Sequence, residues 1–570
     1  MKLINKKASV EKPWLQYYPE PLRSFVPSDD TLTDFIIKNN PSSDNAIIDY
    51  YGRTFTLDEI ITETNRVAKG LSAMGVKEND RIVVFLRAVP EFIFTLLAAE
   101  KIGAAILCHD GEPEEKAAAI ADADAKIAMC FDYVSDAEEK ILYNNSNLEK
   151  LILVSPYTYA VKDEIPDYIE NSIRKLYTEC SACDERNVTW ADFLSIGDAV
   201  EGDVSVCKNP DRPLYCSYTS GSTGPSKQVL HTARTMNGVL GQLVIPGGTN
   251  FRLKVLHTLL PPALVAIVNS ILMYNIASGN YLILDAFCDA EDIDLEFMRH
   301  KPNQMIAVPM MADILMKSKR IPEDYPMNDL YVIGGGADPV HNKWLDNIQA
   351  FLRKHGSPAV FSMCYGLSEA GSTVANPHPN QDFKNCGGGI PMRGTTISVF
   401  EPGTQNELDY GQIGEICTSG PSSMIGYGTA EDTEKVLQRH PDGKIWVHTG
   451  DYGYMNESGE LFVYSRGLNK RFDGGCLYTT VMENKVVDIK GIDDCFFVIT
   501  ADKEHDGYFL PYLYVILDKG VALSDIEDEI KSRLEAHEQP VEIFIIEKRE
   551  YFHFKTNRRI LAAKILKGEH

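Results

Sequence analysis

The sequence lacks the long apolar segments that would place a protein in or across a membrane. Its start, MKLINKKASVEKPW, is basic but leads into no apolar run, so we expect no signal peptide. The most apolar stretch, residues 259–277, is interrupted by two prolines and three small polar residues, which favours a buried element over a membrane span. We therefore expect a cytoplasmic protein with no membrane span.

The cysteine spacing and the small number of basic residues disfavour two further classes, metal- or disulfide-stabilised proteins and nucleic-acid-binding proteins. The twelve cysteines form no framework, and the one C-x-x-C pair, Cys180 and Cys183, has no second pair at zinc-site spacing. Reduced thiols in a cytoplasm are expected. The chain has 56 Lys and Arg residues against 81 Asp and Glu residues, which gives a net charge of −25. Such a charge repels the phosphate backbone of nucleic acids. Nucleic acid is therefore not an expected partner.

The chain does have the length and pattern of an α/β protein. With 570 residues, 44% of them hydrophobic, it is long enough for several domains. In residues 56–107, a capping box at Thr56 and Glu59 opens a helix, and Pro90 opens another that Gly103 closes. The apolar runs at 81–86 and 104–107 predict strands covered on both faces. This alternation predicts a parallel sheet flanked by helices.

The last hundred residues have a more mixed pattern. Residues 512–517 and 541–546 read as strands, and Ser524 with Glu527 at capping-box spacing predicts a helix between them. The glycine-containing segment 465–475 before them predicts a linker.

The most informative segment is YTSGSTGPSK at 218–227. Glycines let backbone N–H groups converge on an anion, hydroxyls add donors and the lysine adds charge, as in a phosphate-binding loop. A Walker A loop is excluded, because the two glycines are too close and Gln228 follows Lys227. The alternative is a flexible Gly/Ser loop. The candidate phosphate-binding residues are Thr219, Ser220, Gly221, Ser222, Thr223, Gly224 and Lys227.

With this loop, four further segments in order resemble the acyl-adenylate-forming superfamily, which includes acyl-CoA synthetases, adenylation domains and luciferases. They are CYGLSEAG at 364–371, GEICTSGPSSMIGY at 414–427, TGD at 449–451 and Arg466 beyond it. The resemblance extends over nearly the whole chain. It implies a large adenylate-forming domain of α/β subdomains at residues 1–466 and a small mobile α+β domain at 467–570.

The resemblance also implies roles for matching residues. Tyr365 would stack on adenine, for which an aromatic face is suited. Ser368 would contact phosphate, and Glu369, with Thr219, would hold Mg²⁺, which prefers oxygen ligands. Asp451 would bind the ribose hydroxyls and Arg466 the ribose–phosphate edge. The adenine side would be bounded by Gly335, Gly336, Ala337 and Gly366. Without the motifs, these would read as a core tyrosine, a turn aspartate and a solvated arginine.

A closing lysine is the last element of the resemblance. The superfamily ends in a motif like G-K-[IV]-D-R-[KR]-x-L, and this chain has FHFKTNRRIL at 552–561. Aligning the two makes Lys555 the candidate catalytic lysine, beside Glu369 and Ser368, and puts Phe554 where the glycine stands. Lys555 would neutralise charge that develops on the carboxylate and α-phosphate. The alternative is a basic solvated tail.

These residues predict a two-step ligase. ATP, Mg²⁺ and a carboxylic acid would give an acyl-adenylate, and the C-terminal domain would then reorient about 466–469 while the thiol of CoA takes the acyl group. No acidic residue lies between Leu259 and Leu284, which disfavours an α-amino acid substrate. One alternative acceptor is the pantetheine of a carrier protein. A third reading, an inactive nucleotide sensor, is motivated by departures from the motifs at Gln228, Leu468 and Phe554.

Overall fold

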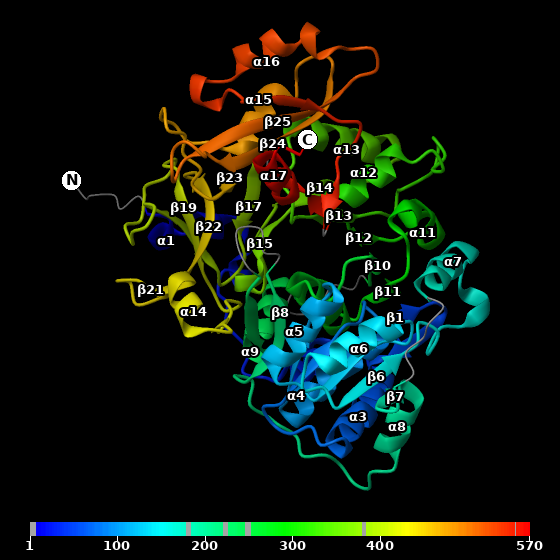
Figure 1. The fold of residues 1–570 in the computed structure, drawn as a ribbon. Coiled ribbons are helices and arrows are strands. Elements are labelled where there is room, and N and C mark those ends of the chain that lie inside the picture. Colours follow the sequence, from blue (N-terminus) through cyan, green and yellow to red (C-terminus); the bar gives the residue numbers. More distant parts are fainter. Residues whose placement is uncertain are drawn as a thin grey trace.

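The computed structural model describes residues 7–177, 184–219, 226–244, 252–378, 384–552 and 554–569. In these ranges, three large sheets and their helices make up the N-terminal part, and a small sheet with three helices lies above them (Figure 1). The predicted α/β class is confirmed. Cys180 and Cys183 lie outside the described residues.

One large sheet has the strand order β20-β9-β8-β4-β3-β5-β6-β7 and is parallel from β8 to β7. Its strands are β3 (Arg81–Val84), β4 (Ala105–Cys108), β5 (Ile127–Phe131), β6 (Lys150–Val154), β7 (Asn187–Thr189), β8 (Pro213–Tyr218), β9 (Gln228–Thr232) and β20 (Gly426–Tyr427). Since β8 and β9 pair antiparallel, the predicted phosphate-binding loop is the connection of a hairpin.

The helices of this half follow the predicted pattern. Thr56 and Glu59 form the expected capping box at the start of α3 (Leu57–Ala73), and Gly103, with a φ of +76°, ends α4 (Pro90–Ile102). The remaining helices before residue 244, of which the first packs on a different sheet, are α1 (Ala8–Glu11), α2 (Leu32–Asn39), α5 (Pro113–Ala123), α6 (Asp136–Asn144), α7 (Asp167–Leu176), α8 (Trp190–Asp198) and α9 (Ala233–Leu243).

A second large sheet has the order β14-β13-β12-β10-β11-β1-β2 and is parallel except at β1–β2. Its strands are β1 (Ala46–Tyr50), β2 (Arg53–Thr56), β10 (Lys254–Thr258), β11 (Tyr281–Asp285), β12 (Gln304–Ile306), β13 (Val332–Gly335) and β14 (Phe361–Met363). Its helices are α10 (Tyr274–Ala277), α11 (Ile293–His300), α12 (Pro309–Lys317) and α13 (Asn342–Lys354).

The apolar stretch 259–277 is a buried element, as predicted. It forms a π-helix, Ile267–Met273, that continues into α10, and Asn269 within it donates to the carbonyl of Gly371 (2.7 Å). Among the described helices, none combines the length and the apolar character that a membrane crossing requires.

The third large sheet is antiparallel, with the order β15-β16-β17-β23-β22-β19-β18, and β21 (Leu437–Arg439) pairs with β22. Its other strands are β15 (Tyr365–Leu367), β16 (Ser372–Asn376), β17 (Gly387–Pro391), β18 (Thr396–Phe400), β19 (Gly414–Ser419), β22 (Ile445–Met455) and β23 (Leu461–Arg466). Helix α14 (Ala430–Val436) adjoins β20 and β22. This sheet carries three of the residues that the motifs single out: Tyr365, Asp451 and Arg466.

The C-terminal part has a core of its own, which includes Met482, Phe497 and Leu513. It contains β24 (Ile492–Ala501), β25 (Phe509–Leu517), β26 (Ile543–Ile545), the hairpin of β27 (Tyr551–Phe552) and β28 (Lys555–Thr556), and helices α15 (Thr479–Val486), α16 (Glu527–Arg533) and α17 (Arg558–Lys567). Both predicted strands are confirmed.

The predicted capping box at Ser524 and Glu527 is wrong. Helix α16 begins only at Glu527, because residues 523–525 form a separate 3-10 turn in which Asp525 accepts from the N–H of Ala522 (3.1 Å). The predicted helix between the two strands is present as α16, but Ser524 does not open it.

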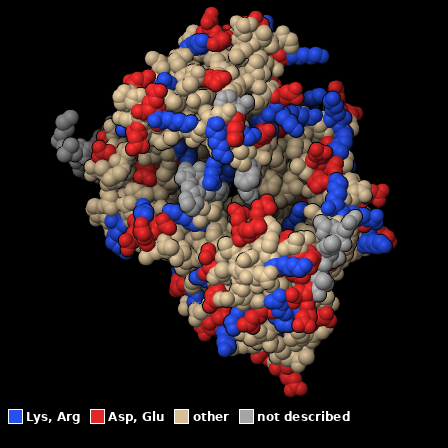
Figure 2. Space-filling model, in the orientation of Figure 1, with Lys and Arg blue, Asp and Glu red and all other residues tan. Residues whose placement is uncertain are grey.

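Basic and acidic residues are both spread over the surface of the molecule. Figure 2 shows Lys and Arg interspersed with Asp and Glu over one face of the molecule, and this face is hollowed between the small C-terminal part and the sheets below it.

A buried carboxyl in the first turn of α4 makes stability depend on pH. Glu91 is 1% exposed, and neither of its carboxyl oxygens has a hydrogen-bond partner in the described part of the chain. Burial raises the pKa of Glu91 from 4.5 to about 8. Between these two values the unfolded chain has lost a proton that the folded chain keeps, so this group makes stability fall as pH rises.

We therefore expect Glu91→Gln to stabilise the protein at neutral pH, by on the order of 1–3 kcal/mol at pH 7 and by little at pH 5. Unfolding followed as a function of pH measures the difference. Glu100, also buried in α4, is the comparison: burial raises its pKa too, but it accepts from Thr33 N (2.9 Å) and from the Thr33 hydroxyl, so Glu100→Gln should stabilise less than Glu91→Gln. Parallel pH curves for Glu91→Gln and the wild type would contradict the account.

Candidate active site

Asp451 is the centre of the group that β15, β22 and β23 bring together. The register pairs Asp451 with Arg466, and the guanidinium of Arg466 donates to Asp451 Oδ1 (2.9 Å). The hydroxyl of Tyr365 donates to Asp451 Oδ2 (2.7 Å), and burial raises the pKa of Tyr365 well above its ordinary value, which keeps the hydroxyl protonated. A carboxylate offers about four acceptor positions, so Asp451 can still accept from two hydroxyls of a ligand.

Glu415 fixes the turn that carries Asp451. Its Oε1 accepts from the N–H of Gly450 (3.1 Å), and its Oε2 is bonded to Nδ1 of His448 (2.9 Å). The hydroxyl of Thr449 donates to the carbonyl of Ile416 (2.6 Å) and accepts from the N–H of Asp451 (3.0 Å). Sequence reasoning quoted Glu415 within a motif but gave it no role, since the contact spans 35 residues.

Glu369 is held beside this group. Ser368 and Glu369 form a short 3-10 helix, η6 (Ser368–Ala370), whose Ser368 carbonyl is bonded to Nε2 of His231 (2.8 Å). Burial lowers the pKa of His231 to about 4, so the imidazole is neutral and donates there. Tyr427 donates to Glu369 Oε1 (2.7 Å). A buried carboxylate held in this way suits Mg²⁺, a hard cation that prefers oxygen.

The base of the predicted phosphate-binding loop lies close to Glu369. The N–H of Lys227 donates to the hydroxyl of Thr219 (3.0 Å), which closes the hairpin. The ammonium of Lys227 pairs with Asp432 (2.8 Å) and lies 5.1 Å from the ring centre of Tyr427, the residue bonded to Glu369. Sequence reasoning quoted Tyr427 within a motif but gave it no role, and it missed Asp432. The loop residues Ser220, Gly221, Ser222, Thr223 and Gly224 lie outside the described part of the chain.

The glycines on the adenine side are explained by packing. A Cβ atom at Gly335 would lie 2.8 Å from the carbonyl oxygen of Ala307, and one at Gly366 would lie 2.2 Å from that of Ser372. At Gly336 the corresponding distance, to the carbonyl of Cys364, is 2.5 Å, and Ala337 has a φ of +75°. These strands therefore require glycine whether or not a ligand is bound, and contact with adenine stays a prediction.

Lys555 reaches the same region from the β27–β28 hairpin. Burial lowers the pKa of Lys555, while the carboxylates of Asp338, Asp451 and Glu369 oppose this change and Arg466 reinforces it. Lys555 is half-buried, and the residue after it, Thr556, is buried and donates its N–H to Asp338 (2.9 Å), unlike a residue of a solvated tail. Phe554, in place of the motif's glycine, has a φ of +65° and packs against the large hydrophobic core.

Known proteins match most of this chain. The AMP-binding enzyme family matches residues 36–428. The chain is 26% identical to 4-coumarate-CoA ligase 2 of Narcissus pseudonarcissus, over 84% of this chain and 80% of that protein, and 24% identical to 4-coumarate–CoA ligase CCL1 of Humulus lupulus, over 90% of each.

Solved structures show the same fold. ATP-bound MatB of Rhodopseudomonas palustris matches with a TM-score of 0.77 and 18% identity, over 95% of this chain and 99% of that one. The anthranilate CoA ligase AuaEII, in complex with anthranoyl-AMP, matches with a TM-score of 0.76 and 14% identity, over 98% and 100%. The predicted resemblance is confirmed, and the chain belongs to the AMP-binding enzyme family.

Proposed function

We propose that this protein is an AMP-forming acid–CoA ligase. It joins a carboxylic acid to AMP at the expense of ATP, releases pyrophosphate, and then transfers the acyl group to CoA. The observation that supports the proposal is that Tyr365 and Arg466 both bond to the carboxylate of Asp451, from segments about 100 residues apart in the chain. Glu369, bonded to Tyr427, and the half-buried Lys555 are the further motif residues that we assign to this site.

In the first step, an oxygen of the carboxylate attacks the α-phosphorus of ATP, and the bond from that phosphorus to the bridging oxygen breaks. Asp451 and Arg466 orient the ribose, and Tyr365 offers its ring to adenine. Lys555 stabilises the charge that develops between the carboxylate and the α-phosphate. Glu369, with Thr219, would hold Mg²⁺, which neutralises phosphate charge when bound.

The substrate we propose is a carboxylic acid without an α-ammonium group. The buried segment 259–277 offers no carboxylate to pair with such a cation, and an unpaired buried cation is costly. The relatives named above are ligases of 4-coumarate, and one neighbour is a ligase of anthranilate. Aromatic acids are therefore the first class to test, followed by fatty acids.

We further propose that the domain boundary lies between residues 466 and 467. β23 ends at Arg466, Gly467 has a φ of +80°, and the following residues lead into a part with a separate hydrophobic core. A position between two cores is typical of domain boundaries.

Product analysis tests the ligase. Incubation with ATP, Mg²⁺, CoA and a panel of acids should give AMP and an acyl-CoA in equal amounts, as measured by mass spectrometry. An adenylate that stays at about one equivalent per enzyme with CoA, and is discharged by a pantetheinylated carrier protein, would replace CoA with that acceptor. Hydrolysis to ADP, or ATP binding with no adenylate for any acid, would contradict the proposal; the second result would favour a nucleotide sensor.

A further inference from the structure

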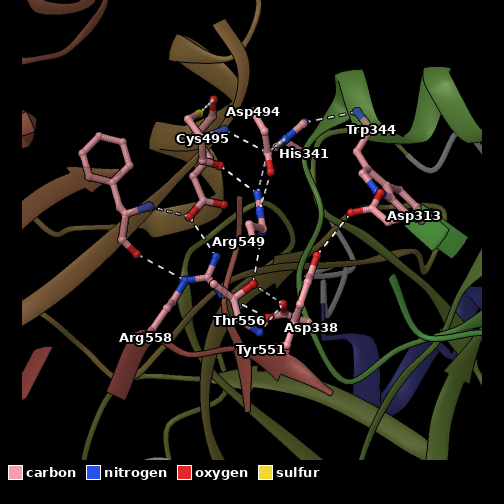
Figure 3. A network of polar contacts seen from close by, with 12 residues as sticks. Asp313, Asp338, His341, Trp344, Asp494, Cys495, Arg549, Tyr551, Thr556 and Arg558 are labelled. Carbon is pink, nitrogen blue, oxygen red and sulfur yellow. Dashed lines mark hydrogen bonds and ion pairs between the residues drawn. The ribbon is translucent and has the colours of Figure 1, made fainter. Parts of the chain in front are cut away.

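The residues that follow Lys555 are held by one carboxylate of the N-terminal part. Asp338 lies just beyond β13 and is 6% exposed. Its Oδ2 accepts from the N–H (2.9 Å) and the hydroxyl (2.5 Å) of Thr556, and its Oδ1 accepts from the guanidinium of Arg558 (3.0 Å) (Figure 3). One side chain thus fixes the backbone next to Lys555 and the first residue of α17.

The same carboxylate acts on Lys555 electrostatically. Burial lowers the pKa of Lys555, and among the effects that oppose this lowering the charge of Asp338 is the largest. Asp451 and Glu369 act in the same direction, and Arg466 acts against them. Asp338 is therefore both the anchor of the segment that carries Lys555 and the main counter-charge of its ammonium.

The partners of Asp338 are themselves braced. Arg558 also binds Glu483 (3.0 Å) and the carbonyl of Phe497 (3.2 Å), both in the C-terminal part. The hydroxyl of Thr556 accepts from Arg549 (3.1 Å). Thr556 and Arg558, the residues that donate to Asp338, are each held by a second contact. The hydrogen bonds to Asp338 therefore hold the β27–β28 hairpin in one position relative to the N-terminal part.

A second contact, beside the first, holds the two parts together. Asp494, in β24, is bound by Arg549 (2.7 Å) and by Nε2 of His341 (2.8 Å) (Figure 3). Nδ1 of His341 accepts from the N–H of Trp344 (3.1 Å) at the start of α13, so Nε2 carries the proton that is donated to Asp494. His341 lies three residues after Asp338, and the two contacts together leave the hairpin little freedom.

The backbone at Phe554 fits this assignment. A φ of +65° at a residue with a side chain is costly and persists where the surroundings determine it. Here the bonds of Asp338 to Thr556 fix the chain two residues later, and the Phe554 side chain packs against the core. The turn that precedes Lys555 is thereby held in one form.

We propose that Asp338 is the positioning residue for Lys555: it locks the 555–558 segment so that the ammonium is placed for adenylate formation. This rests on the proposed function, because it gives Lys555 its task. Asp338 itself touches no reacting atom; its effect passes through Lys555.

A double-mutant cycle tests the proposal, with acid-dependent exchange of labelled pyrophosphate into ATP as the measured rate. Asp338→Asn keeps the shape but removes the charge, and we expect kcat to fall by about 10–100-fold with the KM for ATP changed by less than about 3-fold. In a Lys555→Ala background the same change should cost less than about 2-fold, because the residue acts only through Lys555. Asp338→Glu should recover part of the rate.

Asp313 provides the matched control. It accepts from Tyr551 (3.2 Å) and Trp344 (2.7 Å) at the same interface, but it is bonded to no residue of 555–558 (Figure 3). Asp313→Asn should lower the rate by less than about 3-fold. Equal losses for Asp313→Asn and Asp338→Asn, or a loss that is as large without Lys555 as with it, would overturn the proposal in favour of a general interface role.

A second variant and the rate of the wild-type protein distinguish failure of this inference from failure to fold and from failure of the proposed function. Should Asp338→Asn fail to fold, Thr556→Val removes the two bonds of the hydroxyl, to Asp338 and from Arg549, and keeps the bond from the Thr556 N–H to Asp338. It is expected to lower kcat by about 3–10-fold, again only when Lys555 is present; wild-type kcat in Thr556→Val would overturn the proposal. A wild-type protein that exchanges with no acid overturns the proposed function, and this inference with it. Active wild type, a Lys555→Ala rate lowered by about 10²–10³-fold and fully active Asp338→Asn overturn the positioning role alone.

Discussion

Replacing Lys555 with alanine is expected to lower the rate of adenylate formation by about 10²–10³-fold while ATP still binds. Lys555 is half-buried, and the charges of Asp338, Asp451 and Glu369 oppose the lowering of its pKa, so its own charge acts where water screens it less than at the surface. Pyrophosphate exchange measures the rate, and equilibrium binding of labelled ATP measures the affinity.

A second variant, Lys564→Ala, distinguishes a catalytic lysine at position 555 from a basic, solvated tail. Lys564 is an exposed lysine of α17, nine residues further along the same basic segment. Lys564→Ala should leave exchange within about 2-fold of wild type, since an exposed charge contributes little. Similar rates for Lys555→Ala and Lys564→Ala would show that the segment serves only as a basic tail.

Glu369→Gln is expected to have the second large effect, a loss of at least about 10²-fold at low millimolar Mg²⁺ with a raised requirement for the metal. The amide keeps the shape and can still accept from Tyr427, but it lacks the charge that a hard cation requires. Exchange rates across a Mg²⁺ titration measure the change.

Tyr427→Phe is the control for Glu369. It removes the 2.7 Å hydrogen bond and leaves the carboxylate, so we expect a loss of about 3–10-fold. An unchanged Mg²⁺ dependence in Glu369→Gln would exclude Glu369 as a metal ligand.

Local signals in the sequence predicted local structure well. The capping box at Thr56 and the glycine at 103 mark where α3 begins and α4 ends, because both depend on contacts within one turn of helix. At Ser524 the same spacing failed, because Ala522 and Asp525 cap a 3-10 turn in its place.

The motif residues were found by resemblance, and their mutual contacts were not. Nothing in the local sequence pairs Lys227 with Asp432, or Asp338 with Thr556 and Arg558 some 220 residues later. Such partners depend on how the sheets and the C-terminal part are placed, which only tertiary structure provides.

The structure explains two of the three departures from the family motifs, those at Gln228 and Phe554. Gln228 donates to the hydroxyl of Tyr218 (2.8 Å) across the β8–β9 hairpin, so its side chain has a structural task where the family motif has glycine. Phe554 keeps the backbone form of a glycine and adds core packing. Nothing in the structure explains Leu468. The first two are compatible with an active enzyme and weaken the case for a sensor.

The central claim is that this protein makes acyl-adenylates, and exchange of labelled pyrophosphate into ATP tests it most directly, because the reaction reports reversal of the first step without CoA. The account predicts exchange that requires both Mg²⁺ and a carboxylic acid and that falls by about 10²–10³-fold in Lys555→Ala. ATP binding without exchange for every aromatic and fatty acid in the panel, or exchange that persists unchanged in Lys555→Ala, would contradict it.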